Sequence, residues 1–414
     1  MNSLTPLGIK AKTASKVLAM ASPEAKNNAL LLIAEEIKAN CDRIIAANLK
    51  DLDAARANGM SASLIDRLML DEKRVFAMAD GVLALMQLED PVGKVLEETV
   101  RPNGVKITKV SVPLGVIGII YEARPNVTSD AAAIALKAGS AVILRGGKEA
   151  FNSNLETTEI MRGALLKAGL PADAIQLVTD TTRQSATDLM TLNGYLDVLI
   201  PRGGAGLIKA AVENSTVPVI ETGTGNCHAF VDSSANIKMA TEIVFNGKVQ
   251  RPSVCNALET LLVHKDIAKT ALPEICGKLK DAGVEIRGCD KTCEILDYAI
   301  LANETDFATE FLGHTISVKV VDDLFAAVEH IDKYSTHHSE VIITESAENA
   351  KYFTAAIDSA AVYHNASTRF TDGGEFGLGA EIGISTQKLH ARGPMGLSEI
   401  TSYKYIVSGN GQIR

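Results

Sequence analysis

Between residues 116 and 220, short β-branched and apolar runs alternate with stretches long enough to form helices. The runs cover residues 116–120, 141–144, 175–179, 198–200 and 217–220. Parallel strands require such crossover segments, because tight turns join only antiparallel neighbours. The alternation therefore predicts an α/β fold in which βαβ units build a parallel sheet.

A second alternating region extends from residue 229 to about residue 365, with strand candidates at residues 257–264, 284–287, 316–321, 341–344 and 360–363. The first ninety or so residues instead predict helices. Ser22, followed by a proline, is a typical helix start, and apolar residues continue that helix through Ile37. Further helices are expected over residues 41–57 and after Asp71.

Residues 97–110 predict a β-hairpin, because a Pro-Asn-Gly turn separates two alternating segments. The many alternating charges of this hairpin argue against a place in the core. The C-terminal run 401–407 predicts an edge strand. We expect residues 97–112 and 399–414 to form an arm that is used in subunit contact.

The chain has 414 residues, which favours two or three domains. Its net charge of −9 argues against nucleic acid or an anionic membrane surface as a partner. An anionic substrate would therefore require a local group of Arg and Lys side chains. The start lacks the layout of a signal peptide, and apolar runs stay below the ~20 residues that span a bilayer, so we expect a cytoplasmic protein.

Six cysteines are scattered over the chain and do not resemble a disulfide framework. Cys289 and Cys293 lack a second pair at zinc-ligand spacing. The adjacent residues His337 and His338 would point in different directions on a helix or a strand. We therefore expect no metal site.

Three Gly-rich loops follow predicted strands, at residues 145–148, 201–206 and 221–225. In parallel sheets, ligands bind at the carboxyl ends of the strands. Glycine lets the backbone approach a ligand closely, and a helix that begins just beyond the loop offers N–H groups to a phosphate. The three loops therefore predict a nucleotide site. A longer Gly-rich segment, residues 365–383, is either disordered or an ordered active-site loop.

Cys255 lies among polar and turn-forming residues, just before an apolar run that starts at Ala257. A structural cysteine is found more often inside such a run. As a thiolate, Cys255 could hold an acyl group as a thioester. The local sequence leaves two interpretations open, a covalent nucleophile and a small apolar residue at a strand start.

Six motifs extend over essentially the whole chain, at residues 121–128, 144–148, 200–206, 250–256, 365–374 and 385–396. One of them is Gln-Arg-Pro-Ser-Val-Cys-Asn at residues 250–256. Together the motifs resemble the aldehyde dehydrogenase superfamily, and within it the reductases of proline biosynthesis. The resemblance implies a Rossmann-type cofactor domain, an α/β catalytic domain and a small β oligomerisation arm.

The resemblance also sets the expected domain bounds. Residues 1–96 and 113–225 would form the dinucleotide-binding domain, and residues 226–365 the catalytic domain. Residues 366–398 would form an active-site loop region that returns to the cofactor domain. The implied reaction is the NADPH-dependent reduction of L-glutamyl 5-phosphate to L-glutamate 5-semialdehyde, with release of phosphate.

Cys255 falls where the superfamily keeps its nucleophile, so the resemblance implies a thioester at this residue. The oxyanion would be stabilised by the Cys255 backbone N–H and by the side-chain amide of Asn126. Glu221 lies where hydrolytic members keep a base; because no water needs activation here, it would line the nicotinamide site or be structural. Glu310 lies where the superfamily holds the nicotinamide ribose, and a solvated acid is the alternative.

Arg145 and Lys148 follow the strand whose end faces the adenosine ribose in this fold. A lysine suits a ribose 2′-phosphate, so we predict NADPH rather than NADH. The alternative is a solvated loop lysine. The Gly-rich loops add four expected cofactor contacts, namely Arg202, Gly203, Gly204 and Gly223.

Arg124, Arg251 and Arg369 are expected to bind the carboxylate and the phosphate of the substrate, because a guanidinium suits bidentate contact with both. Ser367 and Thr368 would add hydroxyl contacts. Structural ion pairs are the alternative for each arginine. The expected partners are the small-molecule substrate and further copies of the chain, and contact with a glutamate 5-kinase is left open.

Two other functions compete with this interpretation. One is a hydrolytic NAD(P)-dependent aldehyde dehydrogenase with Glu221 as its base; Lys148 and the Arg-Pro-Ser-Val-Cys context argue against it. The other is a nucleotide-binding protein without catalysis, against which Cys255 and the three Gly-rich loops argue. A fold alone never guarantees a chemistry.

Overall fold

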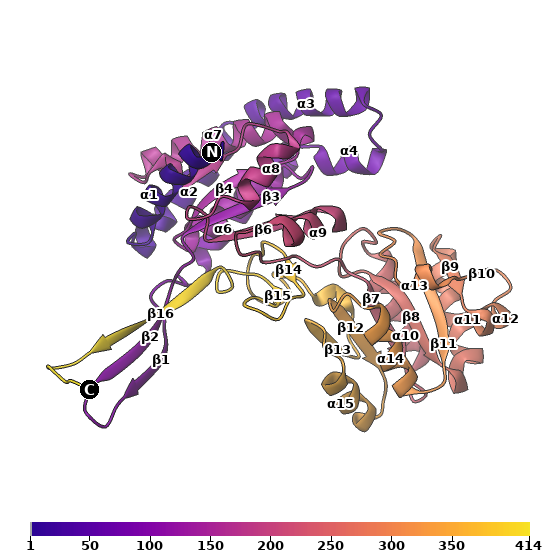
Figure 1. The fold of residues 1–414 in the computed structure, drawn as a ribbon. Helices are drawn as coiled ribbons and strands as arrows, with labels where there is room; N and C mark the ends of the chain where they lie inside the picture. Colours follow the sequence, from indigo (N-terminus) through magenta and orange to yellow (C-terminus); the bar gives the residue numbers. More distant parts are fainter. Residues whose placement is uncertain (1) are drawn as a thin grey trace. The chain divides into compact units, whose positions relative to one another are not determined.

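The computed structural model describes residues 2–414 and divides into two compact units (Figure 1). The first unit comprises Met1–Thr222, Gly377–Gly383 and Met395–Arg414, and the second comprises Gly223–Phe376 and Ile384–Pro394. The segment 366–398 is therefore shared, because the chain passes from one unit to the other three times within it. Among residues 2–414, no helix combines the length and apolarity needed to cross a membrane.

The first unit begins with helices, as the sequence predicts. They are α1 (Thr5–Leu18), α2 (Pro23–Ala39), α3 (Cys41–Ala57), α4 (Ala62–Leu68) and α5 (Glu72–Ala84), followed by the 3-10 turn η1 (Leu85–Gln87). Ser22 caps α2 by accepting the Ala25 N–H at 3.2 Å. Asp71 caps α5 in the same way, accepting the Arg74 N–H at 2.8 Å. Side-chain oxygens at these positions satisfy N–H groups that a helix start leaves without partners.

A four-stranded parallel sheet forms the core of the first unit, with strand order β5-β4-β3-β6. The strands are β3 (Val116–Tyr121), β4 (Ala141–Arg145), β5 (Ile175–Leu177) and β6 (Val198–Arg202). The connecting elements are α6 (Asn126–Lys137), η2 (Lys148–Ala150), α7 (Phe151–Lys167), η3 (Ala172–Ala174) and α8 (Arg183–Met190), and α9 (Ala205–Asn214) follows β6. The strand order reverses between β3 and β6, which is the point where open α/β sheets bind ligands.

The predicted strand at residues 217–220 is wrong. Only an isolated bridge forms there, between Leu199 and Val219. The Leu199 N–H donates to the carbonyl of Pro218 at 2.8 Å, and the Ile220 N–H donates back to Leu199 at 2.9 Å. Pro218 has no N–H to extend the ladder, so the segment pairs at one point only.

The predicted hairpin and C-terminal strand form a separate three-stranded antiparallel sheet, with order β1-β2-β16. Its strands are β1 (Val95–Val100), β2 (Lys106–Pro113) and β16 (Thr401–Ser408), so β16 is an edge strand as predicted. Gly104 completes the turn with a positive φ of 86°. Every residue of β1 is exposed, and so is every residue of β16 after Thr401.

The second unit contains a seven-stranded parallel sheet with order β10-β9-β11-β8-β7-β12-β13. The strands are β7 (Cys227–Val231), β8 (Leu258–His264), β9 (Glu285–Gly288), β10 (Ile300–Leu301), β11 (Thr315–Val321), β12 (Ser339–Ile343) and β13 (Ala361–His364). A short antiparallel pair, β14 (Ile384–Ser385) and β15 (Gly393–Pro394), also belongs to this unit.

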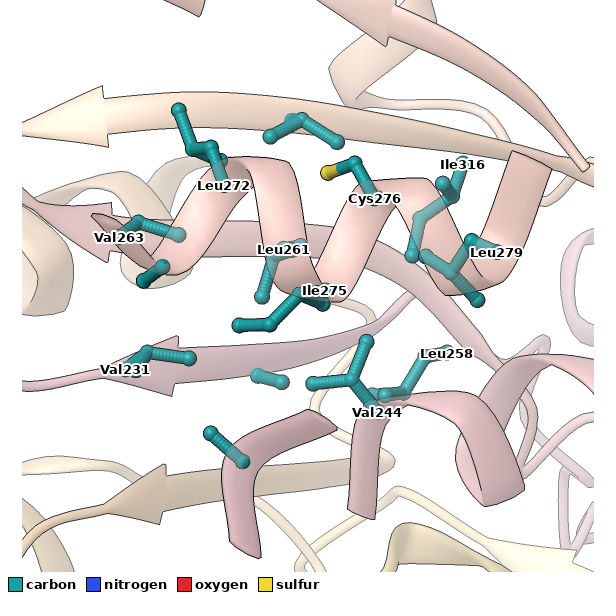
Figure 2. Packing of buried hydrophobic residues seen from close by; sticks show 14 of the residues in the cluster. Val231, Val244, Leu258, Leu261, Val263, Leu272, Ile275, Cys276, Leu279 and Ile316 are labelled. Atoms are coloured by element: carbon teal, nitrogen blue, oxygen red, sulfur yellow. The ribbon is translucent and has the colours of Figure 1, made fainter. Parts of the chain in front are cut away.

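Helices cover both faces of this sheet. Figure 2 shows Leu272, Ile275 and Leu279 of α11 (Lys265–Asp281) packed over β8, and α10 (Ile237–Val249) belongs to the same apolar cluster. A second cluster on the other face includes residues of α14 (Leu324–Tyr334) and α15 (Ala347–Ala356). In β7, β8 and β11, different residues of one strand pack in the two clusters, since successive side chains of a strand point to opposite faces. The remaining helical elements of the unit are α12 (Asp290–Ile295), α13 (Glu304–Phe307) and η4 (Thr368–Phe370).

The strand β7, which lies inside the sheet between β8 and β12, was not predicted from the sequence. Its second residue, His228, is fully buried. The His228 N–H donates to Glu340 Oε2 at 2.7 Å, and the ring Nδ1 lies 3.2 Å from the same oxygen. His228 interrupts the apolar residues of this short strand, so the sequence did not reveal its central position.

Candidate active site

Cys255 lies in the loop that joins the end of α10 at Val249 to the start of β8 at Leu258. Its side chain is half-buried, and its carbonyl accepts a hydrogen bond from the Cys227 thiol at an S···O distance of 3.2 Å. A Cβ added to Gly225 would lie 1.5 Å from this carbonyl oxygen. Residue 225 must therefore be glycine for the two backbones to pack as they do.

A second loop, around η4, closes over the residue that follows Cys255. The Thr368 hydroxyl donates to the Asn256 carbonyl at 2.7 Å, and the Asn256 amide donates to the Thr371 carbonyl at 2.9 Å. Arg369 donates from Nε to Gln250 Oε1 at 3.0 Å and from a second nitrogen to Asn256 Oδ1. Both ends of the Cys255 loop are thus bonded to the 367–371 segment.

Two guanidinium groups lie near Cys255 in this unit. Burial lowers the pKa of Arg369, and the positive charge of Arg251 lowers it further, while the thiol of Cys255 acts in the opposite direction. Arg251 is exposed and Arg369 is half-buried. The structure therefore brings together Cys255, Arg251 and Arg369, a thiol and two cations suited to an anionic acyl substrate.

Ser367 and Thr368 are both buried, and their hydroxyls form hydrogen bonds within the protein. Ser367 Oγ accepts the Arg369 N–H at 3.3 Å, and Thr368 Oγ1 bonds the Asn256 carbonyl. Their contacts order the loop that carries Arg369. Direct contact of these hydroxyls with a substrate stays a prediction.

Glu310 bonds to the same Gly-rich segment that packs on Cys255. Its Oε1 accepts the Gly225 N–H at 2.8 Å. Burial raises the pKa of Glu310, whereas the Gly225 N–H and the charge of Lys248 lower it. The Glu310 side chain is half-buried, and its contact with a cofactor ribose stays a prediction.

Gly223 lies at the other end of the same segment, beside β14. Its N–H donates to the Ile384 carbonyl at 2.9 Å, and an added Cβ would lie 2.4 Å from the methyl carbon of Thr386. Glu221, two residues earlier, is half-buried and belongs to the first unit. The glycines at 223 and 225 are thus required by packing within the second unit, a role that the sequence did not predict.

Arg145 ends β4 in the first unit, and Lys148 begins η2 shortly after it, but the surroundings of the two side chains differ. One terminal nitrogen of Arg145 donates to the carbonyls of Thr181 and Thr182, at 2.9 and 2.8 Å. Burial lowers the pKa of Arg145, and the charge of Asp180 opposes this shift. Arg145 therefore holds two loops together, whereas Lys148 is exposed at the start of η2.

Arg202 ends β6, Gly203 and Gly204 form the short loop after it, and α9 begins just beyond. The Gly204 N–H donates to Glu122 Oε2 at 3.0 Å, and a Cβ on Gly203 would lie 2.6 Å from the same carboxyl group. The start of α9 thus already holds a carboxylate, which compensates its N–H groups as a bound anion would. Glu122 was not among the predicted site residues.

Arg124 lies between β3 and α6 in the first unit, Asn126 is the first residue of α6, and both are exposed. The Asn126 amide donates to Asp130 Oδ2 at 2.9 Å, one helical turn further on. Burial raises the pKa of Asp130 to about 6, while Asn126, Ser129 and Arg202 lower it. The i, i+4 spacing of Asn126 and Asp130 was the signal in the sequence that could have found this pair.

Among residues 2–414, no three His, Cys, Asp or Glu side chains group as metal ligands would. Cys289 and Cys293 instead bond to backbone and hydroxyl groups around β9 and α12.

Comparison with known proteins identifies the family. Residues 9–293 match the model of the aldehyde dehydrogenase family. The chain belongs to the aldehyde dehydrogenase family. Curated relatives named gamma-glutamyl phosphate reductase are 58% identical in Caldanaerobacter subterraneus, over 98% of each chain, and 58% identical in Carboxydothermus hydrogenoformans, over 100% of each chain. The predicted resemblance is thereby confirmed over the full length.

Solved structures agree with this assignment. The crystal structure of gamma-glutamyl phosphate reductase from Thermotoga maritima superimposes with a TM-score of 0.98 at 49% identity, covering 99% of each chain. An acetylating aldehyde dehydrogenase from Geobacillus thermoglucosidasius gives a TM-score of 0.71 at 18% identity, covering 100% of this chain and 97% of that one. The second comparison shows the shared fold alone, and it confirms the predicted aldehyde dehydrogenase-like α/β class.

The packing of Gly225 on Cys255 yields a first prediction. The variant Gly225→Ala should lose about 1–3 kcal/mol of unfolding free energy, because the new methyl group forces the two backbones apart. Alkylation of Cys255 by iodoacetamide should also change in rate, since its loop must move. Unfolding titrations and peptide mass spectrometry would measure the two effects.

Gly277→Ala is the matched control, because a Cβ on Gly277 in α11 meets nothing within 4 Å. This variant should keep the alkylation rate of the wild type and its stability to within about 1 kcal/mol. Equal behaviour of the two variants would contradict the packing account.

His338 yields a prediction on pH. It is fully buried, its Nδ1 lies 2.9 Å from Ser339 Oγ and 3.7 Å from the Cys227 sulfur, and burial lowers its pKa to about 4. Between pH 6.5 and 4 the unfolded chain binds a proton at this residue that the folded chain does not bind. The unfolding free energy should therefore fall as pH is lowered through this window, by about 3 kcal/mol from His338.

Urea titrations between pH 7 and pH 4 would measure this slope. The variant His338→Gln should show a shallower fall than the wild type. The control His337→Asn, at an exposed neighbour with a positive φ of 59°, should keep the slope of the wild type. Parallel slopes for all three proteins would rule out a buried neutral imidazole at residue 338.

Proposed function

We propose that this protein reduces L-glutamyl 5-phosphate to L-glutamate 5-semialdehyde with NADPH, releasing phosphate, in proline biosynthesis. The name shared by its full-length relatives supports the reaction. One structural observation supports the chemistry most. Cys255 and Arg251 share a loop, and the loop that carries Arg369 is hydrogen-bonded to it. A thiol beside two guanidinium groups suits an acyl phosphate that also has a carboxylate.

In the proposed mechanism, the Cys255 thiolate attacks the acyl carbon of the substrate. A sulfur–carbon bond forms, and the carbon–oxygen bond to phosphate breaks, with phosphate taking its electron pair. Arg251 and Arg369 neutralise the charge on the substrate and on the departing phosphate. The oxyanion is stabilised by the Cys255 backbone N–H and, in the same proposal, by the amide of Asn126.

A nicotinamide cofactor, when bound, supplies the hydride that reduces the thioester. Cys255 then leaves as a thiolate, and the aldehyde is released. No water is activated in this sequence, so Glu221 has no task as a base and would line the cofactor site. Glu310 would hold the nicotinamide ribose, with one of its oxygens already fixed by the Gly225 N–H. Arg124, Ser367 and Thr368 would complete the substrate contacts.

The residues of the first unit fit a phosphorylated ribose best at Lys148. Its side chain is exposed after the carboxyl end of β4, a strand that neighbours β3 in the sheet. Arg145 would act through the loop that it holds, because its terminal nitrogen is bonded to two carbonyls. Arg202, Gly203, Gly204 and Gly223 remain expected contacts of the cofactor.

The arm of β1, β2 and β16 suits contact with a second copy of the chain. It exposes seven large apolar side chains, at Val95, Leu96, Val100, Tyr403, Tyr405, Ile406 and Val407. Such a surface gains stability when it is covered by another chain. We therefore propose a homo-oligomer built through this arm. We also propose a cytoplasmic location, in keeping with six free cysteines among the described residues, and leave contact with a glutamate 5-kinase as a hypothesis.

Phosphate dependence separates this function from a hydrolytic dehydrogenase. The reverse reaction, reduction of NADP+ by glutamate 5-semialdehyde, should require inorganic phosphate and should disappear in Cys255→Ala. The physical reason is that phosphate must attack the thioester in this direction. Absorbance of the reduced cofactor at varied phosphate concentrations would measure it.

Turnover without phosphate would instead support a hydrolytic enzyme that uses Glu221 as its base. Cofactor binding without turnover in either direction would support a non-catalytic nucleotide-binding protein. Cys276→Ala is a matched control for the thiol, because Cys276 lies buried in α11 within the apolar cluster.

Cofactor preference tests the assignment of Lys148. The variant Lys148→Glu should lose about tenfold or more in kcat/KM with NADPH and little with NADH, since a carboxylate would repel a 2′-phosphate and accept the ribose hydroxyls. Lys10→Glu, at an exposed position of α1, is the charge-matched control. An unchanged preference in Lys148→Glu would remove this residue from the cofactor site.

A further inference from the structure

Lys248 and Glu259 form a fully buried ion pair in the second unit, with Nζ 2.5 Å from Oε2. Both side chains have no exposed surface. Burial lowers the pKa of Lys248, and the charge of Glu259 opposes this shift. Removing two charges from water is costly, and an apolar pair of similar volume often stabilises a fold as well. Stability alone therefore explains this pair poorly.

The two residues of the pair flank the Cys255 loop in the sequence, one before it and one after it. Lys248 lies in the last turn of α10, just before the loop, and Glu259 is the second residue of β8, just after it. The ion pair therefore fixes the distance between the two points from which the loop departs. Gln250 and Asn256, which bond to Arg369, lie inside the same loop.

The other oxygen of Glu259 reaches the segment that carries Glu310. Glu259 Oε1 accepts the Leu312 N–H at 3.2 Å, and Leu312 has a positive φ of 53°. The ring centroid of Phe311 is 6.0 Å from Lys248 Nζ and 5.4 Å from the Arg287 guanidinium carbon. A non-glycine residue rarely adopts such a φ unless its surroundings hold it there.

Glu310 closes the connection, because its carboxylate bonds the Gly225 N–H and Gly225 packs on the Cys255 carbonyl. The charge of Lys248 also favours the ionised form of Glu310 against burial. The buried ion pair thus flanks the Cys255 loop and also contacts the segment that carries Glu310. No substrate or cofactor atom needs to touch it.

We propose that Lys248 and Glu259 are positioning residues, which hold the Cys255 loop and the Glu310 segment in one fixed geometry. The kinetic part of this inference rests on the proposed function. The part that concerns loop geometry does not, because thiol reactivity and amide exchange need no turnover.

Two double variants separate positioning from stability. Lys248→Met/Glu259→Leu removes both charges and the acceptor of the Leu312 N–H, whereas Lys248→Met/Glu259→Gln removes the charges and keeps an acceptor oxygen. Because no lone charge stays buried, both should melt within about 3 °C of the wild type. Lys291→Met, which breaks an exposed pair with Asp322, is the control.

Three readouts apply to each protein at a temperature well below its melting point. They are the rate at which iodoacetamide alkylates Cys255, the rate of hydrogen exchange in the peptide that contains Leu312, and the separate values of KM for NADPH and of kcat. The Met/Leu variant should show about a tenfold rise in KM, with faster exchange and an altered alkylation rate. The Met/Gln variant should lie between it and the wild type, with about a threefold rise in KM.

Wild-type values of all three readouts in the Met/Leu variant would overturn the proposal, and the pair would then be structural only. If the Met/Leu variant does not fold, the Met/Gln variant decides, and values equal to those of Lys291→Met would overturn the proposal in the same way. If the wild-type enzyme shows no turnover, the proposed function fails. The alkylation and exchange measurements would still decide whether the ion pair positions the two loops.

Discussion

The contact between Gly225 and the Cys255 carbonyl constrains the second unit more than any other. A side chain at residue 225 would overlap the backbone of the Cys255 loop, so the two segments can pack only when residue 225 has no side chain. The Gly225 N–H is then directed to Glu310, and the Cys227 thiol bonds the Cys255 carbonyl. Around this contact, Glu259 and Arg369 connect the neighbouring loops. A reactive thiol needs such a frame, because small displacements of a reacting group greatly lower its rate.

Much of the fold could be predicted from the sequence, because its signals are local. Ser22 and Asp71 cap helices where the sequence places them, and the hairpin turn forms at Gly104. One error has a local cause. The segment 217–220 has a strand-like composition, but Pro218 cannot donate to a ladder. The strand that contains His228 was missed because a histidine interrupts its apolar residues, and the contact of its backbone N–H with Glu340 joins residues that are distant in the sequence.

The candidate site was predictable where a motif keeps its residues close in sequence. Arg251 and Cys255 share a loop, and the structure adds Arg369 to it. The packing role of Gly223 and Gly225 was not predictable, because two glycines in a sequence do not indicate which distant loop they will contact. The buried pair of Lys248 and Glu259 was missed for a related reason. Eleven residues separate them, and isolated charges in a sequence are typical of surfaces.

The central claim is that Cys255 holds the acyl group during the reaction. Mixing the enzyme with freshly made glutamyl 5-phosphate in the absence of NADPH, quenching in acid and mapping peptides by mass spectrometry would test it most directly. The account predicts a glutamyl thioester on Cys255, which disappears when NADPH is added before the quench. Phosphate release without any modified cysteine, or an acyl group on another residue, would contradict it.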